Sequence, residues 1–274
     1  MLFPGIVFGP IKSRRLGVSL GINLLPEENK WCNFNCIYCE CGWNDKDNKA
    51  PRVLPARKDV YNALEYRLAA IRDSVEDSGP VADNEIISNS KPACYPDVIT
   101  FSGNGEPTMH PDFSGIIDDT ILLRDKYSPE SKISVLSNAT MLDRPDVVSA
   151  LKKVDNNILK LDSVFLSTVE LIDQPLKKVD SDKLAGQLKA FDGKFIIQTM
   201  FLRGKRNEVI IDNTVQAELD AWESWIQKVC PASVMIYSLD RDTPADNLEK
   251  VAAKELEFIA NRVRRHGIPV SVAG

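Results

Sequence analysis

A chain of 274 residues and 30.5 kDa is larger than most single domains, yet one α/β barrel accommodates it. Hydrophobic residues make up 43% and charged residues 27%, which excludes a disordered, collagen-like or fibrous chain. The 34 basic and 39 acidic residues give a net charge of −5, so no overall positive field attracts nucleic acid, and an RNA partner would need a local basic patch.

Apolar, β-rich runs alternate with helical patterns from about residue 18 onward. Helical stripes start near Val60, Val215 and Ala252. Six β-then-α units predict a parallel sheet with right-handed crossovers, either an open doubly wound sheet or a curved, incomplete barrel. A last strand or edge is expected at Ile268–Val272. The six expected strands are Val18–Leu24, Asp97–Gly103, Lys132–Asn138, Ile158–Ser163, Lys194–Phe201 and Ser233–Ser238.

No change of composition divides the chain, so we predict a single domain over residues 1–274, with residues 1–17 as an N-terminal arm. Ser78–Pro96 is rich in Pro, Gly, Ser, Asn and Asp, which predicts a surface insertion, and Glu40–Pro55 is polar, which predicts a loop. No stretch approaches the roughly eighteen apolar residues of a membrane span, and the N-terminus lacks the pattern of a secretion signal. A cytoplasmic location is therefore expected.

Four of the six cysteines lie within ten residues, and Cys32, Cys36 and Cys39 form a C-x₃-C-x₂-C motif. Such close spacing is poor disulfide geometry and is typical of metal ligands in a reducing compartment. Three thiolates can bind one face of a four-iron cluster, leaving one iron free for a small molecule. A zinc site would need a fourth ligand, for which Cys41 is the candidate. We expect Cys94, Cys230 and an unligated Cys41 to be ordinary buried thiols.

A glycine-rich segment, Ser102-Gly103-Asn104-Gly105-Glu106-Pro107-Thr108, ends the second expected strand. Active sites of α/β folds lie at the carboxyl ends of parallel strands. Glycines let the backbone approach a ligand, and Glu106 can accept charge-assisted hydrogen bonds from an ammonium group. Thr108 replaces the third glycine of a dinucleotide fingerprint, so that motif is absent. The alternative is a plain glycine turn after a strand.

The cysteine motif with Tyr38 before its last cysteine, followed by a GGE-like Asn104-Gly105-Glu106, resembles the radical S-adenosylmethionine (SAM) superfamily. Phe8–Asn23 and Met235–Pro244 are similar to a compact Fe–S oxidoreductase group related to the wyosine-forming tRNA enzymes. The resemblance extends over nearly the whole chain. Wyosine-forming enzymes carry additional N-terminal cysteines for a second cluster, and residues 1–31 contain none.

The resemblance implies a partial (β/α)₆ TIM-like barrel with a mostly parallel sheet and a [4Fe–4S] cluster on the three motif cysteines. SAM would bind the open iron. Glu106 would receive its ammonium group, Gly105 would give it room, and the backbone at Tyr38 would contact its adenine. Ser137 and Asn138 match the position that contacts the ribose.

Strand alternation indicates further residues inside such a barrel. Lys160 and Asp162 share one face of the fourth strand, and Leu159 and Leu161 share the other. In a barrel the charged pair would point inward, where each residue needs a partner. Lys160 would bind the SAM carboxylate and Asp162 the substrate, or the two would form a structural ion pair. Gln198 is a third inward candidate.

Arg14 and Arg15 are candidates for binding an anionic substrate group or a phosphate, and a solvated arm explains them as well. Tyr237 and Asp240 end the sixth strand, where they would line the mouth of the barrel. The alternative for Tyr237 is a core aromatic residue.

The family mechanism implied by the resemblance uses a reduced cluster to cleave SAM to methionine and a 5′-deoxyadenosyl radical. The radical abstracts hydrogen from a substrate, here a small molecule or an RNA nucleoside, and a flavodoxin- or ferredoxin-like protein donates the electron. Two alternatives are a zinc-stabilised binding module and an activase of a glycyl-radical enzyme. Only two histidines are present, so little acid–base chemistry by histidine is expected.

Overall fold

The computed structural model describes residues 2–44, 53–78, 94–206 and 208–273. Most of the predicted insertion Ser78–Pro96 and the second half of the predicted loop Glu40–Pro55 lie outside the described residues. Within the described residues, no helix is long and apolar enough to cross a membrane.

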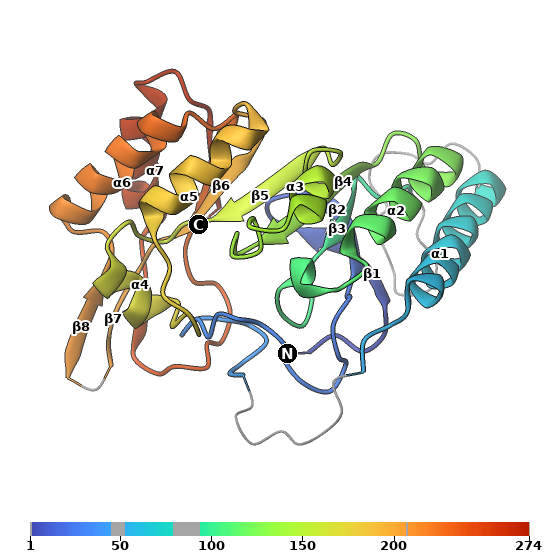
Figure 1. Ribbon diagram of the computed structural model, residues 1–274, viewed down its shortest axis with the longest axis horizontal. Coiled ribbons are helices and arrows are strands. Elements are labelled where there is room, and N and C mark those ends of the chain that lie inside the picture. Colours follow the sequence, from blue (N-terminus) through green and yellow to red (C-terminus); the bar gives the residue numbers. More distant parts are fainter. Residues whose placement is uncertain (1, 45–52, 79–93, 207, 274) are drawn as a thin grey trace.

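The chain has an α/β fold built on one eight-stranded sheet with the order β1-β2-β3-β4-β5-β6-β9-β11. All neighbours pair in parallel except β1 and β2, which form an antiparallel hairpin. The sheet curls into a half-barrel, so of the two architectures that the sequence left open, the incomplete barrel is confirmed (Figure 1). Its strands are β1 (Val7–Ser13), β2 (Gly17–Ile22), β3 (Val98–Phe101), β4 (Lys132–Ser137), β5 (Asn156–Lys160), β6 (Ile196–Met200), β9 (Ser233–Tyr237) and β11 (Val270–Ala273).

The predicted strands are present, but several end earlier than their apolar patterns suggested. The segment expected to end at Gly103 leaves the sheet after Phe101, and the one expected to end at Ser163 leaves it after Lys160. The polar residues at these carboxyl ends turn away from the ladder to form loops. The segment interpreted as an N-terminal arm contains β1.

Most of the helices gather on one side of the curled sheet (Figure 1). Their apolar faces pack on the strands to form the main core, which includes Leu159 and Leu161 of the fifth strand region. The helices are α1 (Arg57–Ser78), α2 (Phe113–Tyr127), α3 (Pro145–Leu151), α4 (Leu166–Ile172), α5 (Ser181–Leu188), α6 (Gln216–Val229) and α7 (Ala253–Arg264), with 3₁₀ turns at Pro107–Met109 and Lys189–Phe191.

A small antiparallel sheet, not predicted from the sequence, is formed by two strands that follow β6 and one that follows β9. Its strands are short and two of them are rich in charged residues, a pattern that is difficult to distinguish from a polar loop. Arg203 connects this sheet to α7 through an ion pair with Glu255. The strands are β7 (Leu202–Arg206), β8 (Val209–Asp212) and β10 (Leu248–Lys250).

Two of the cysteines predicted to be buried are exposed. Cys94 precedes β3 in a loop, and Cys230 ends α6 in a left-handed conformation, so both lie where the chain turns at the surface. Cys41 is partly buried.

Candidate functional site

The cysteine motif lies on a loop that begins after β2 and is anchored to the glycine-rich segment after β3. The Trp31 N–H donates to the Asn104 carbonyl at 2.8 Å, and the Glu106 N–H donates to the Trp31 carbonyl at 3.2 Å. Gly105, between them, has φ of +148°, and a Cβ atom there would lie 1.9 Å from the Trp31 oxygen. Glycine is therefore required at this position by the cysteine loop itself.

Asn104, which replaces the first glycine of the family motif, has a structural role. It is fully buried, its amide nitrogen donates to the carbonyls of Phe3 and Pro26, and its amide oxygen accepts from the Phe3 N–H. The side chain thereby holds the N-terminal segment against the cysteine loop, so it is occupied by the chain and leaves no polar group for a ligand.

The other side of the cysteine loop is held by the end of α4. Three backbone hydrogen bonds, each 2.9 Å long, join the loop to residues 172–176. This segment consists of the last residue of α4 and the four residues after it. Backbone contacts of this kind fix the path of the loop without depending on side-chain identity. The pairs are Asn35 N–H to Asp173 O, Ile37 N–H to Ile172 O and Leu176 N–H to Asn33 O.

The three motif thiols are buried or partly buried and lie within electrostatic reach of one another. Burial raises the pKa of Cys32 to about 12 and raises the pKa of Cys36. The contact with the Cys41 side chain, aided by the Lys30 charge, lowers the pKa of Cys39 to about 5. The Cys41 thiol donates to the Gly103 carbonyl at 3.1 Å.

Lys30 is a buried cation beside these thiols that the sequence reasoning missed. Its ammonium group donates to the Gly42 carbonyl at 3.0 Å. Burial opposes its charge, but the negative charges of Cys39, Cys32 and Cys36 raise the pKa of Lys30. Its position in the sequence, two residues before the first motif cysteine, could have indicated that it lies close to the thiols. Its charge balances that of the sulfur ligands.

The donor set fits an iron–sulfur cluster better than a single metal ion. Among the described residues, no group of three or more His, Cys, Asp or Glu is close enough to hold one ion. A zinc site needs four such donors in a tetrahedron, whereas a cuboidal cluster spaces its thiolates across an iron–sulfur framework. Three thiols on one loop with a charge-balancing lysine satisfy the second requirement.

Glu106 is the buried carboxylate of the site and is only 2% exposed. Oε1 accepts from the Thr108 N–H at 3.1 Å and from the Thr108 hydroxyl at 2.5 Å, and Oε2 accepts from the Asn138 N–H at 2.6 Å. Burial raises the pKa of Glu106, because these neutral donors only partly offset the loss of water. A cationic ligand would supply the missing charge.

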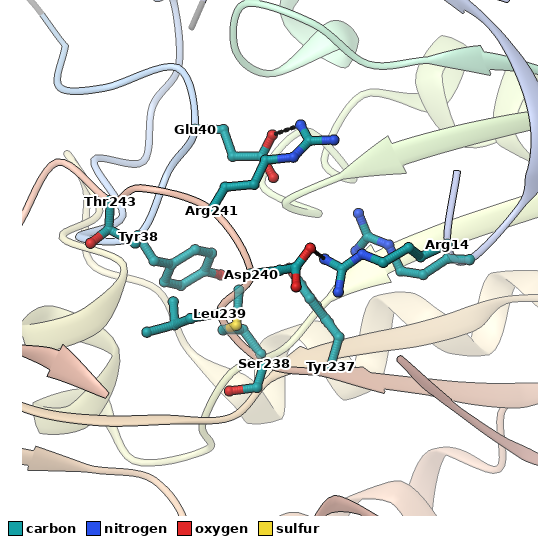
Figure 2. Close-up of a pocket in the computed structure, with 11 residues that line it drawn as sticks. Arg14, Tyr38, Glu40, Tyr237, Ser238, Leu239, Asp240, Arg241 and Thr243 are labelled. Atoms are coloured by element: carbon teal, nitrogen blue, oxygen red, sulfur yellow. Dashed lines mark hydrogen bonds and ion pairs between the residues drawn. The ribbon is translucent and has the colours of Figure 1, made fainter. Parts of the chain in front are cut away.

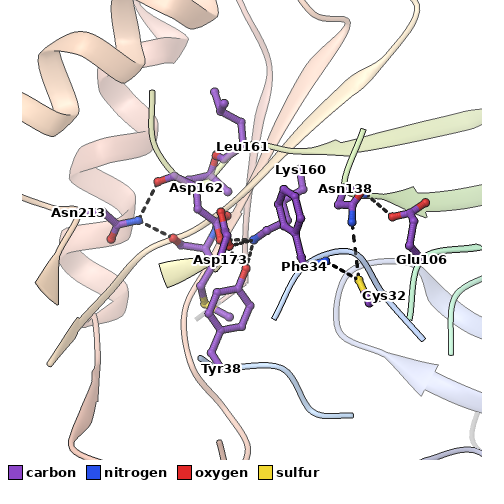
Figure 3. A network of polar contacts seen from close by, with 12 residues as sticks. Cys32, Phe34, Tyr38, Glu106, Asn138, Lys160, Leu161, Asp162, Asp173 and Asn213 are labelled. Carbon is purple, nitrogen blue, oxygen red and sulfur yellow. Dashed lines mark hydrogen bonds and ion pairs between the residues drawn. The ribbon is translucent and has the colours of Figure 1, made fainter. Parts of the chain in front are cut away.

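The structure brings Asn138 between the carboxylate and the first cysteine, as Figure 3 shows. Its side-chain amide donates to the Cys32 sulfur at 3.6 Å and to the Asn33 amide oxygen at 2.6 Å. Ser137, the preceding residue, is buried, and its hydroxyl accepts from the Ala139 N–H at 3.0 Å. Ser137 ends β4, one residue before the strand end that the sequence suggested, and Asn138 follows it.

Lys160 lies in a second polar cluster, also visible in Figure 3. It forms ion pairs with Asp162 and, at 2.9 Å, with Asp173, and it contacts the hydroxyl group of Tyr38. The Tyr38 hydroxyl donates to Asp162. The two carboxylates raise the pKa of Lys160 despite its burial. The predicted structural ion pair is thus present, and Gln198 lies next to Lys160 in the sheet register.

Asp173 was not predicted, because it lies in a connection after α4 with no strand periodicity to indicate its direction. It is buried, and burial raises its pKa to about 7, with the Lys160 charge acting in the opposite sense. This carboxyl therefore titrates near neutral pH.

A cavity of about 800 Å³ opens beside both polar clusters. It lies past the carboxyl ends of β4 and β5, and α4 and α5 supply its outer wall. Its lining is mainly apolar, which suits a pocket that excludes water. The residues it shares with the two clusters are Asn33, Asn138, Lys160, Asp162 and Asp173.

A smaller cavity of about 30 Å³ lies where the β1–β2 turn meets the segment after β9 (Figure 2). Arg14 forms an ion pair with Asp240 at 3.1 Å. The guanidinium carbon of Arg15 lies 4.4 Å from the centre of the Tyr237 ring. Tyr38 also lines this cavity, so its ring stands between the cysteine loop and the arginines.

The fold is similar to solved structures of radical SAM enzymes. TYW1 with a lysine–pyruvate adduct aligns over 90% of this chain and 73% of its own, with a TM-score of 0.60 and 16% identity. A radical SAM methyltransferase from Sphaerobacter thermophilus aligns over 93% and 65%, with a TM-score of 0.61 and 11% identity. SuiB of Streptococcus suis bound to S-adenosylmethionine aligns over 90% and 49%, with a TM-score of 0.58 and 14% identity. The chain therefore has the radical SAM fold, which confirms the predicted resemblance at the level of the fold.

The curated relatives are proteins described mostly as UPF0026. The Methanocaldococcus jannaschii UPF0026 protein is 31% identical over 72% of this chain and 54% of its own length. A Helicobacter pylori UPF0026 protein is 28% identical over 87% and 67%. A Brachyspira hyodysenteriae protein named GTPase Obg is 29% identical over 92% of this chain, which spans only 32% of that relative. No model of a known protein family matches the chain.

Proposed function

We propose that this protein is a radical SAM enzyme whose [4Fe–4S] cluster is held by Cys32, Cys36 and Cys39. The observation that carries the proposal is the placement of three motif thiols, within electrostatic reach of one another, beside Glu106, a buried carboxylate whose hydrogen-bond donors are all neutral. Asn138 touches both groups. A ligand with a cationic amino group and a metal-binding end suits this arrangement.

In this proposal the residues around Glu106 bind SAM. Glu106 accepts hydrogen bonds from the amino group, and Gly105 keeps the backbone close. Ser137 and Asn138 bind the ribose, and the Tyr38 backbone contacts the adenine. The supporting observation is that Asn138 already spans from the carboxylate to the Cys32 sulfur.

Lys160 and Gln198 complete the proposed cofactor contacts. Lys160 lines the large cavity and is surrounded by two carboxylates, of which Asp173 has a pKa of about 7. A SAM carboxylate would share the ammonium group with Asp162 once Asp173 holds a proton. Asp162, Tyr237 and Arg14 remain the proposed substrate contacts.

The reduced cluster, when bound, supplies the electron that cleaves SAM to methionine and a 5′-deoxyadenosyl radical, which abstracts hydrogen from the substrate. The chain positions the reacting atoms and excludes water. Phe34, Met141 and Leu161, in the lining of the large cavity, serve the second purpose. We further propose a flavodoxin- or ferredoxin-like electron donor and a cytoplasmic location.

The test is anaerobic reconstitution with iron and sulfide, followed by dithionite and SAM. About four irons per chain and release of 5′-deoxyadenosine are expected. A Cys36→Ser variant should lose both results, whereas Cys230→Ser, at an exposed site remote from the motif, should keep them. One zinc per chain without 5′-deoxyadenosine would contradict the proposal and support the binding-module alternative. A glycyl radical formed in a partner protein would identify the activase.

A further inference from the structure

Three arginines and two carboxylates line the small cavity between the β1–β2 turn and the segment after β9. Two of the arginines have anionic partners within this lining. Arg14 pairs with Asp240 at 3.1 Å, and Arg241 pairs with Glu40. Figure 2 shows both contacts among the residues that line the cavity. The two carboxylates are thus engaged, and the positive charge of the third arginine is left over.

That third residue is Arg15. Its Nη1 atom is buried and has no hydrogen-bond partner, and within the described ranges no carboxylate forms an ion pair with its guanidinium group. The group is instead held by the Tyr237 ring, at 4.4 Å. A buried guanidinium nitrogen without an acceptor costs free energy, and the stacked ring orients it without consuming its donors.

The cavity is of a size to hold the end of an anion. A single water needs roughly 10–15 Å³ of such space, so about 30 Å³ holds two oxygens of a carboxylate or a phosphate. The planar guanidinium group of Arg15 matches that pair of oxygens in a two-point contact.

The position of the cavity connects it to the proposed reaction. Tyr38 lines the small cavity, while its hydroxyl group donates to Asp162, which lines the large cavity. One tyrosine ring therefore separates the arginine from the polar cluster beside the proposed cofactor site. An anionic group held at Arg15 would be anchored on the inner side of the half-barrel.

We propose that Arg15 is the anchor of a subsite for the anionic group, carboxylate or phosphate, of a small-molecule substrate. The inference rests on the proposed function and deepens it by naming the substrate class. A small molecule is favoured over RNA because Arg14 and Arg241 already have acidic partners and the cavity takes one group. An extended phosphate backbone would need a row of uncompensated cations.

The test measures binding of inorganic phosphate to the oxidised holoenzyme by equilibrium dialysis at fixed ionic strength. We expect one saturable site per chain. Arg15→Met should weaken it by roughly tenfold or more, which corresponds to the loss of a charge-assisted contact. Lys12→Met, on β1 of the same hairpin, is the matched control and should change the affinity by less than about twofold, because Lys12 is exposed and does not line the cavity.

Several results would overturn the inference. These are the absence of saturable phosphate binding, equal binding by the Arg15→Met variant, and equal losses in Arg15→Met and Lys12→Met. Arg15→Gln provides a second neutral variant should Arg15→Met fail to retain its cluster absorbance. Displacement of the phosphate by SAM would assign the site to the cofactor, and this result would also overturn the inference. Competition with acetate tests whether the subsite binds a carboxylate as well as a phosphate. Acetate should displace the phosphate if a carboxylate is bound there, and should not displace it if the subsite is specific for phosphate.

RNA is the second competitor. Displacement of the phosphate by a transfer RNA at micromolar concentration would contradict the small-molecule assignment, whereas no displacement is expected. Because dialysis requires neither reduction nor SAM cleavage, its result is independent of whether 5′-deoxyadenosine is released. A failed cleavage assay and a failed phosphate assay are thus separate outcomes.

Discussion

Glu106 shows how a single side chain can be prepared for a ligand. The fold removes it from water and surrounds it with hydrogen-bond donors from Thr108 and Asn138, but with no cation among these partners. Burying a carboxylate in this way is costly, which is why burial raises its pKa. The cost is recovered when an ammonium group arrives.

The first prediction concerns this carboxylate. Glu106→Gln preserves the shape and removes the charge, so it should weaken SAM binding roughly 10- to 100-fold while the iron content is unchanged. Calorimetric titration of SAM into the reconstituted variant measures this. Glu218→Gln is the control, because Glu218 is also buried and bonds to Ser163 and Thr168 but does not itself line the cavity. Equal SAM affinity of wild type and Glu106→Gln would contradict the assigned role.

The second prediction concerns Asp173 and pH. Its pKa is about 7 in the folded chain and about 4 when unfolded, so the folded state holds an extra proton between these values. The free energy of unfolding of the cluster-free chain should therefore fall as pH rises from about 4 to 7, by at most about 1.4 kcal/mol per pH unit from this group. Urea unfolding at several pH values measures the slope. Asp173→Asn should flatten it, and the exposed Asp182→Asn should not.

At the scale of elements, the cysteine loop is held on two sides by backbone contacts. One contact is to the glycine-rich segment after β3, and the other is to the end of α4. The loop has little regular secondary structure of its own, so its shape depends on these neighbours. Gly105 is the position where that dependence is strictest, because its φ and the nearby Trp31 oxygen both exclude a side chain.

The third prediction follows from this geometry. Gly105→Ala should lower the free energy of unfolding by about 2 kcal/mol or more and reduce iron incorporation, since the loop must move to admit the methyl group. Gly186→Ala is the matched control within α5, where a Cβ atom meets nothing within 4 Å. That variant should be stabilised by about 0.5–1 kcal/mol. Urea unfolding and iron analysis of both variants measure these effects. If Gly105→Ala left both the free energy of unfolding and the iron content unchanged, the close contact with the Trp31 oxygen would be contradicted.

Local patterns were sufficient to predict the parallel strands of the half-barrel, but not β1, which lies in the segment interpreted as an arm. Alternation along β5 separated Lys160 and Asp162 from the two leucines that pack under the helices. The spacing of the cysteines and the position of Glu106 after β3 were also readable. Lys30 and Asp173 were not, because their roles depend on contacts that only the folded loop and the end of α4 create. The small sheet was missed because its strands have three to five residues each.

At the scale of the whole molecule, Asn213 connects that small sheet to the polar cluster. It follows β8, and its amide nitrogen donates to the carbonyls of Asp162 and Met200 at 2.9 and 2.8 Å. Its amide oxygen accepts from the Leu202 N–H at 2.9 Å. A single side chain therefore satisfies three buried backbone groups where β6 gives way to the small sheet.

The fourth prediction tests this connection. Asn213→Ala leaves these backbone groups without partners and should lower the free energy of unfolding by about 2–4 kcal/mol. Asn261→Ala, at an exposed position on α7, should change it by less than about 0.5 kcal/mol. Urea unfolding gives both values. Amide hydrogen exchange at Leu202, whose N–H donates to the Asn213 side chain, should also accelerate in Asn213→Ala, and unchanged exchange would show that the asparagine does not support the site.

The backbone contacts between the cysteine loop and residues 172–176 have a consequence for handling the protein. The same stretch of chain that steadies the sulfur ligands also forms part of the wall of the 800 Å³ cavity. Oxidation of the thiols that we propose as cluster ligands would therefore disturb the wall of the cavity as well. Preparations that have bleached should lose ligand affinity in proportion to their lost colour, so titrations are meaningful only when normalised to intact iron.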